Sequence, residues 1–257
     1  MLQSLGWAVL GTGFTFLMTT LGAAMVFFFA GEPRPSFQKT LLGFAAGVMT
    51  AASVWSLLLP AIDRAAALPL PPWLPAAAGM LLGVVFLAAL DGLLPRLRRN
   101  RVRRDASWQQ TTLLMTAITL HNVPEGMAVG LAFALASGGE GLAGAAALAM
   151  GIGIQNFPEG AAISLPLRQE GFSRFRSFVY GMLSGIVEPV FGILVVLAAG
   201  SIQPLMPWLL SFAAGAMMYV VVEELIPEAH LGEHSNVGTL GVMGGFLVMM
   251  VLDVALG

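Results

Sequence analysis

Eight long apolar stretches, separated by short polar or Pro/Gly-rich breaks, take up almost all of the sequence. Each is about 20 residues long, the length that an α-helix needs to cross the hydrocarbon core of a bilayer. A soluble domain carries roughly 25% charged residues, whereas this chain has 10% charged and 57% hydrophobic residues. The sequence therefore predicts an all-α polytopic membrane protein, a single transmembrane domain over residues 1–257 with the lipid bilayer as its solvent. The predicted spans cover approximately residues 4–29, 41–63, 73–94, 110–136, 142–167, 177–200, 207–230 and 237–256.

The charge and cysteine counts exclude several classes of function. With 12 Lys and Arg against 14 Asp and Glu, the net charge is −2, so no basic surface is available to neutralise the phosphates of a nucleic acid partner. The absence of cysteine excludes a disulfide framework, thiolate metal ligands and a Cys nucleophile. The sequence has no Gly-rich phosphate-binding loop, so transport driven by ATP hydrolysis is not expected.

The positive residues lie on one side of the predicted spans. The first, third and fifth loops hold 11 of the 12 Lys and Arg, and only Arg64 falls in an even-numbered loop. Because cytoplasmic loops are enriched in Lys and Arg, the odd-numbered loops are predicted to be cytoplasmic and both termini to lie outside. The Arg-rich stretch 96–104 is interpreted as an anchor on anionic lipid.

The sequence contains a short internal repeat. Phe-Ala-Ala-Gly-Val-Met at 44–49 in span 2 recurs as Phe-Ala-Ala-Gly-Ala-Met at 212–217 in span 7, and each is followed by a proline, Pro60 or Pro227. The two spans run in opposite directions. This pattern predicts an inverted repeat of spans 1–3 and 6–8, with spans 4 and 5 between them in a 3+2+3 arrangement common in transporters.

Two matching polar hexapeptides stand inside predicted spans, where an ionisable residue costs about 2.5–3.5 kcal/mol on insertion scales. His-Asn-Val-Pro-Glu-Gly begins at His121 in span 4, and Gln-Asn-Phe-Pro-Glu-Gly begins at Gln155 in span 5. Residues four apart share a helix face, so each first residue pairs with the glutamate four positions later, Glu125 or Glu159. One imidazole, one amide oxygen and two carboxylates suit Zn²⁺, Fe²⁺, Mn²⁺ or Cd²⁺ but not a soft Cu⁺.

The asparagines of the hexapeptides, Asn122 and Asn156, are rotated about 100° from those pairs. They could serve an adjoining second site that shares Glu125 and Glu159, and Glu188 in span 6 could complete it. The alternative is that the hexapeptides only clamp two helices together by hydrogen bonds. Two carboxylates buried together favour a divalent cation, because a static clamp does not require both charges.

The prolines and glycines of the hexapeptides have structural consequences of their own. Pro124 and Pro158 lack an N–H, so both helices are expected to kink or open at these positions. Gly126 and Gly160 are expected to let another helix or an ion approach closely.

Further polar residues extend this candidate path. Asp253 lies near a span end and is interpreted as interfacial, and Met49 is interpreted as packing rather than as a thioether ligand. The inner half of span 7 is interpreted as an exit path for an ion, with a solvated helix end as the alternative. The exit-path candidates are Glu223, Glu224, Glu228 and His230.

Together the motifs resemble those of the ZIP (Zrt/Irt-like) family of divalent metal transporters, most like its bacterial GufA-type branch. The resemblance covers essentially the whole chain. It implies eight spans in the bacterial inner membrane, both termini periplasmic or extracellular, and homodimers as a frequent assembly. It also implies metal uptake into the cytoplasm as spans 1, 4, 5 and 6 slide, elevator-like, against spans 2, 3, 7 and 8.

The resemblance also implies which residues bind metal. Met49 matches a position near the outer entrance, and Glu224 one on the inner exit path. Two departures stand out: the loop after span 3 is short and has no histidine, and Asn156 replaces an Asp of some relatives, which should weaken the second site. The implied primary site is His121, Glu125, Gln155 and Glu159, and the implied secondary site is Asn122, Asn156 and Glu188 with Glu125 and Glu159 shared.

Three functions remain open from the sequence. The leading hypothesis is a secondary transporter, not an enzyme, that takes up Zn²⁺ and also Cd²⁺, Fe²⁺ or Mn²⁺, with these ions as cargo rather than cofactors. An intramembrane metalloenzyme with a Zn²⁺-bound water is the second, although the chain has only three histidines and no His-Glu-x-x-His. A proton- or sodium-coupled carrier of organic solutes is the third.

Overall fold

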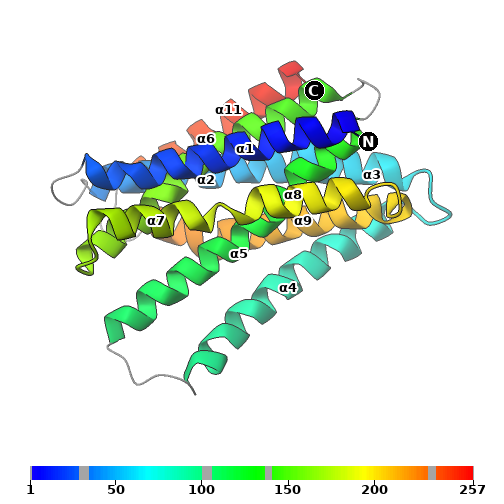
Figure 1. Ribbon diagram of the computed structural model, residues 1–257. Helices are drawn as coiled ribbons and strands as arrows, with labels where there is room; N and C mark the ends of the chain where they lie inside the picture. The colour runs from blue at the N-terminus through cyan, green and yellow to red at the C-terminus, as the bar shows by residue number, and fades with distance from the viewer. Residues whose placement is uncertain (1, 29–34, 100–105, 137–140, 231–235, 257) are drawn as a thin grey trace.

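The computed structural model describes residues 2–28, 35–99, 106–136, 141–230 and 236–256, and these are helical apart from short connections (Figure 1). Two 3₁₀ turns, η1 and η3, and two π-helical turns, η2 and η4, continue neighbouring helices. With α7 and α8, which only Gly185 and Ile186 separate, counted as one rod, the described chain forms eight rods. The helices are α1 (Leu2–Ala24), α2 (Pro35–Ala52), α3 (Leu59–Ala65), α4 (Trp73–Arg99), α5 (Ala106–Leu135), α6 (Leu142–Gln169), α7 (Arg174–Ser184), α8 (Val187–Ala198), α9 (Met206–Val220), α10 (Ile226–His230) and α11 (Val237–Leu256). The short turns are η1 (Met25–Phe27), η2 (Ser53–Leu58), η3 (Gln203–Leu205) and η4 (Val221–Leu225).

The protein is a polytopic membrane protein. Within the described residues, six helical segments are long and apolar enough to cross a bilayer. The helices that carry the hexapeptides, α5 and α6, are not in that set, although their 30 and 28 residues would extend about 45 and 42 Å. Most side chains in the first half of α5 lie outside the described part of the structure. The polar motif and many small residues of α6 lower its hydropathy, and α6 has α1, α2, α5 and α11 as neighbours. A helix surrounded by other helices does not need an apolar surface on every side. The six segments are Leu2–Phe27, Ser36–Ala65, Trp73–Leu90, Arg174–Ala198, Gln203–His230 and Val237–Leu256.

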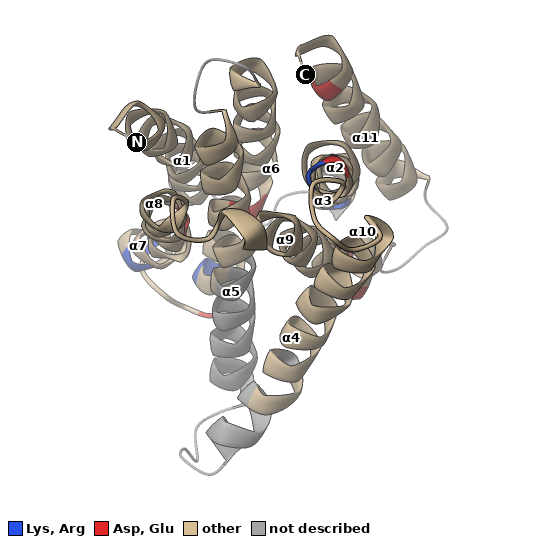
Figure 2. Cartoon of the chain, turned by 90° about the vertical axis from the view of Figure 1, so that its right-hand side faces the viewer, with Lys and Arg blue, Asp and Glu red and all other residues tan. Residues whose placement is uncertain are grey.

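The rods form two bundles that lie side by side (Figure 2). In the first bundle, α1 packs mainly on α6, and α5 packs mainly on α8 with α7 alongside. In the second bundle, α2 packs mainly on α11, and α4 packs mainly on α9. Fewer contacts join the bundles, chiefly α2 and α11 with α6, and α5 with α9. Short blue and red segments in Figure 2 show that Lys, Arg, Asp and Glu are few along the described helices, as expected where most of the surface faces lipid.

Both long rods of the second bundle change partners at a π-helical turn. The rod that begins as α2 contacts α11, but after Ser53–Leu58 its continuation α3 contacts α9 and α4. The rod that begins as α9 contacts α4, but after Val221–Leu225 its continuation α10 contacts α2 and α11. A proline, Pro60 or Pro227, follows two residues after each turn. The wider π turn takes up one extra residue without breaking the helix.

The prolines of the hexapeptides do not open their helices. Pro124 lies inside α5 and Pro158 inside α6, and both helices continue through them. Neither helix opens at its proline, and the predicted kink stays a prediction. Close neighbours account for this difference, because packed helices can hold a proline-containing segment in place despite the lost hydrogen bond.

Glycines bring the helices of the first bundle into backbone contact. A Cβ added to Gly126 would lie 2.4 Å from the carbonyl oxygen of Glu188 on α8, and one added to Gly160 would lie 2.1 Å from that of Thr19 on α1. Only a residue without a side chain permits this approach, which is a common mode of helix packing in membranes. The prediction that both glycines admit a neighbouring helix is confirmed.

Candidate metal site

The two hexapeptides meet across the interface between α5 and α6. The amide nitrogen Nε2 of Gln155 donates to Oε1 of Glu125 over 2.6 Å, and both side chains are fully buried. A donor on one helix thus faces a carboxylate on the other, as the four-residue spacing predicts for helices that pack side by side. Oε2 of Glu125 and the side-chain amide oxygen Oε1 of Gln155 have no hydrogen-bond partner.

The two asparagines use their nitrogen atoms and leave their oxygen atoms unpaired. Asn122 donates to the backbone oxygen of Ser184 over 3.0 Å, and Asn156 donates to Oε2 of Glu188 over 2.8 Å. Both residues are buried, and Oδ1 of each has no partner. Each hexapeptide therefore contributes two unpaired oxygen atoms to the protein interior.

This concentration of unpaired oxygens is unusual for a protein interior. In the described part of the chain, six buried side-chain nitrogen or oxygen atoms have no partner, and four of them belong to the hexapeptides. Leaving a buried acceptor unsatisfied costs about 1–3 kcal/mol, so such groups call for an explanation. Amide and carboxylate oxygens are acceptable ligands for divalent cations such as Zn²⁺ and Mn²⁺, and the chemistry of this donor set fits a cation.

Three carboxylates add negative charge to the same region. Glu125, Glu159 and Glu188 are each 6% exposed or less, and they interact electrostatically with one another. Like charges in a medium of low dielectric constant repel strongly. A divalent cation among them would offset that repulsion, and we see no cationic side chain placed to do so among the described residues of the site.

His121 lies in α5, but its side chain is outside the part of the structure that is described. Its predicted place beside Glu125 stays a prediction. Among the described residues, no three His, Cys, Asp or Glu side chains are arranged to hold a metal ion. The predicted primary site draws on an imidazole and an amide as well as carboxylates, so the described acids alone do not complete it.

The exit-path candidates separate into different environments. Glu224 interacts electrostatically with Glu159 and is half-buried, whereas Glu223 and Glu228 are exposed. His230 is also exposed, and its ring nitrogens lie 3.1 Å from the Ile226 oxygen and 3.0 Å from the Thr239 hydroxyl. Only Glu224 is thus linked to the hexapeptide region in this arrangement.

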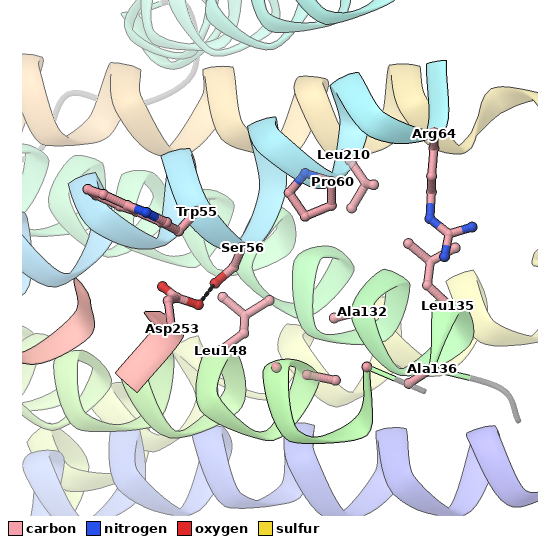
Figure 3. Close-up of a pocket in the computed structure, with 13 residues that line it drawn as sticks. Trp55, Ser56, Pro60, Arg64, Ala132, Leu135, Ala136, Leu148, Leu210 and Asp253 are labelled. Carbon is pink, nitrogen blue, oxygen red and sulfur yellow. Dashed lines mark hydrogen bonds between the residues drawn. The ribbon is translucent and has the colours of Figure 1, made fainter. Parts of the chain in front are cut away.

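A cavity of about 370 Å³ lies between the two bundles, at the end where α5 stops and α6 begins (Figure 3). Its lining residues Ala132 and Leu148 stand seven positions from Glu125 and Gln155, respectively, which is about 10 Å along each helix. Asp253 lines this cavity, accepts a hydrogen bond from Ser56 with one oxygen and leaves the other unpaired. Its interpretation as a plain interfacial residue is therefore incomplete.

Met49 is fully buried in the core formed by the two bundles. Its repeat counterpart Met217 is 1% exposed in the same core. Both positions agree with the interpretation of these methionines as packing residues, and the role of Met49 near an entrance stays a prediction.

Sequence reasoning missed the contribution of α1. Thr12, Thr15 and Thr19 are buried, and the hydroxyl of Thr19 donates to Oε1 of Glu188 over 3.3 Å. The Thr15 hydroxyl donates to the carbonyl oxygen of Thr12 over 3.0 Å. The available signal was the spacing of three and four residues, which places all three threonines on one helix face.

Fold and site together define a polytopic helical membrane protein with a buried, oxygen-rich and acidic centre. A sequence profile described as the ZIP zinc transporter family matches residues 98–253. The human zinc transporter ZIP11 is 37% identical over 97% of both chains. Zinc transporter ZIPB of Bordetella bronchiseptica is 38% identical over 98% of this chain and 82% of its own, and zinc transporter GufA of Myxococcus xanthus is 39% identical over 70% of this chain and 71% of its own. The chain belongs to the ZIP family, whose members are transporters and not enzymes.

Proposed function

We propose that this protein carries Zn²⁺, and also Cd²⁺, Fe²⁺ or Mn²⁺, across the membrane into the cytoplasm without ATP hydrolysis. The observation that carries the proposal is the unpaired buried side-chain oxygen on Glu125 of α5 and on Gln155 of α6. A cation that sheds its water onto these atoms would satisfy acceptors that no protein group satisfies. The proposed ligands are His121, Glu125, Gln155 and Glu159.

The proposed route begins in the cavity of Figure 3. The unpaired oxygen of Asp253 offers a negative group there, about two helical turns from the ligands. Beyond the ligands, Glu224 interacts with Glu159 and leads toward the exposed end of α10. Glu223, Glu228 and His230 complete the proposed exit path.

The proposed topology has eight spans with both termini outside, and spans 1–3 and 6–8 as an inverted repeat. Matched helix pairs support the repeat, because α2 with α11 corresponds to α9 with α4, and α1 with α6 corresponds to α8 with α5. The matched π turns, each followed by a proline, support it as well. The proposed movement is an elevator in which the first bundle, with the ligands on α5 and α6, slides against the second bundle.

Zinc import into liposomes tests this function. Purified protein in liposomes with a zinc-sensitive dye inside should show Zn²⁺ uptake, and Glu125→Gln should reduce uptake to the level of empty liposomes, because it removes the charge but keeps the shape. Glu170→Gln, which alters an exposed acid at the end of α6, is the matched control and should transport normally. Unchanged uptake by Glu125→Gln would remove this residue from the mechanism.

Thermal stability separates this function from the two alternatives. At 100 times its dissociation constant a bound ion stabilises a protein by about 2.7 kcal/mol, so Zn²⁺ or Cd²⁺ should raise the melting temperature of the detergent-solubilised protein. A proton- or sodium-coupled solute carrier predicts no selective shift. A metalloenzyme predicts a shift but no accumulation of the metal inside liposomes.

The proposal also includes a homodimer in the bacterial inner membrane. The helices α4 and α11 expose the largest share of their residues among the six apolar segments, so they are the surfaces available to lipid or to a second copy. The particle mass of the purified protein tests this assembly, and a mass of one chain would contradict it.

A further inference from the structure

The carboxylate of Glu188 has a complete set of hydrogen-bond donors from the protein itself. Oε2 accepts from Asn156 over 2.8 Å, and Oε1 accepts from Thr19 over 3.3 Å. The Thr19 hydroxyl lies 3.2 Å from the Thr15 carbonyl as well, but a charged acceptor makes the stronger hydrogen bond. Unlike Glu125, Glu188 has no unpaired buried oxygen.

The surroundings of Asn156 determine the orientation of its amide group. Its Nδ2 faces two acceptors, the Glu188 carboxylate and the Thr15 carbonyl oxygen at 3.5 Å. A reversed amide would point its oxygen at both, so the nitrogen must take this position. An aspartate here could not donate, and it would place a second carboxylate against Glu188. Such a pair needs a cation between its members, whereas the neutral amide removes that need.

Close packing between α1 and the helix that carries Glu188 fixes the position of the threonines relative to the Glu188 carboxylate. A Cβ added to Gly185 would lie 3.0 Å from the side chain of Thr19, and one added to Gly192 would lie 2.6 Å from that of Thr12. The threonine face of α1 therefore packs against Gly185, just before α8, and against Gly192 within α8, on both sides of Glu188. The carboxylate is held by α1 and α6 while it interacts electrostatically with Glu125 and Glu159.

We propose that this protein carries one divalent cation per cycle, with Glu188 as a fixed counter-charge rather than a ligand, positioned by Thr19 and Asn156. The inference rests on the proposed transport function. It replaces the two-ion arrangement that the family resemblance implies at Asn122, Asn156 and Glu188. The cation takes its ligands from the hexapeptide pairs His121 with Glu125 and Gln155 with Glu159. The carboxylate of Glu188 raises the affinity of the site for the cation by electrostatic attraction, without direct contact.

Binding stoichiometry tests the proposal. Purified full-length protein is dialysed against Zn²⁺, and the metal per chain is measured by mass spectrometry. The wild type and Glu188→Gln should both bind one ion per chain, with affinity about tenfold weaker in the variant because a nearby charge is lost. Asn156→Asp should bind two, because it creates the carboxylate pair that a second cation bridges.

The threonines have a matched pair of variants. Thr19→Val keeps the shape but removes the hydroxyl, so it should raise the KM for Zn²⁺ uptake by roughly tenfold and leave the stoichiometry at one. Thr19→Ser keeps the hydroxyl and should restore the wild-type KM. Equal KM values in the two variants would show that the hydroxyl does not position Glu188.

Different outcomes overturn different proposals. A wild type that binds two ions, with one lost in Glu188→Gln, would make Glu188 a ligand and refute the one-ion inference while transport stands. An Asn156→Asp variant that binds one ion would refute the role of Asn156. A wild type that binds no Zn²⁺ would refute the transport function itself. If Asn156→Asp does not fold, the wild type and Glu188→Gln still decide between one ion and two.

Discussion

The tight contact between Gly126 and Glu188 makes Gly126→Ala the sharpest test of how the site is built. The new methyl group would lie 2.4 Å from the backbone carbonyl oxygen of Glu188 and 2.5 Å from the Cα of Glu188. Non-bonded carbon atoms lie about 3.5–4.0 Å apart. Helices α5 and α8 would have to separate by about 1 Å. Overpacking of this kind costs about 1–3 kcal/mol, more than the roughly 0.5–1 kcal/mol that Ala gains over Gly within a helix.

Two control variants separate packing from site geometry. Gly130→Ala affects the same pair of helices, since its methyl group would lie 2.5 Å from the Gly192 oxygen, but it does not touch Glu188. Gly244→Ala meets nothing within 4 Å and should be neutral or slightly stabilising. The assay is thermal unfolding in detergent, with and without Zn²⁺.

The expected pattern has two parts. Gly126→Ala and Gly130→Ala should both melt at lower temperature than Gly244→Ala, because both force α5 away from α8. The extra stability from Zn²⁺ should fall in Gly126→Ala, where Glu188 moves, and persist in Gly130→Ala. If Gly126→Ala is as stable as Gly244→Ala and keeps the full zinc effect, the close packing of α8 on α5 at Glu188 is refuted.

Two further predictions concern the ends of the proposed path. Asp253→Asn removes the negative charge from the cavity of Figure 3 but keeps an acceptor for Ser56. The KM for Zn²⁺ uptake should therefore rise several-fold with little change in maximal rate. An unchanged KM would mean that ions do not pass this residue. His230→Ala should change the uptake rate by no more than about twofold, as expected for an exposed residue, because both ring nitrogens already contact Ile226 and Thr239. A large loss of uptake would instead show that His230 is essential to the exit path, and not one of several groups at its exposed end.

Much of the fold and the centre of the site were predictable from local patterns. Apolar length alone predicted an all-helical polytopic protein, because the bilayer requires long helices whose backbone groups pair internally. The four-residue spacing in the hexapeptides predicted that Gln155 and Glu125 could meet, and the glycines predicted the close helix approach. These features depend on residues near one another in sequence or on a property of a single helix.

The features that were missed depend on contacts between distant parts of the chain. Ser56 and Asp253 are 197 positions apart, so the cavity of Figure 3 has no local signature. Threonines are common in membrane helices and bond to their own backbone, as Thr12 does to Ala8, which conceals the partnership of α1 with Glu188. The continuity of α5 through Pro124 likewise depends on its neighbours, because a proline considered alone predicts a break.

The two π turns have a mechanical consequence for the second bundle. Each long rod packs mainly against one neighbour before its turn and against two helices after it, so a shift of one rod would press on the others. A lateral push from the bilayer on α4 would pass through α9 and α10 to α2 and α11. Membrane thickness and tension would then tilt this half as one stiff frame, and the proposed movement of the first bundle would keep a constant axis in membranes of different composition.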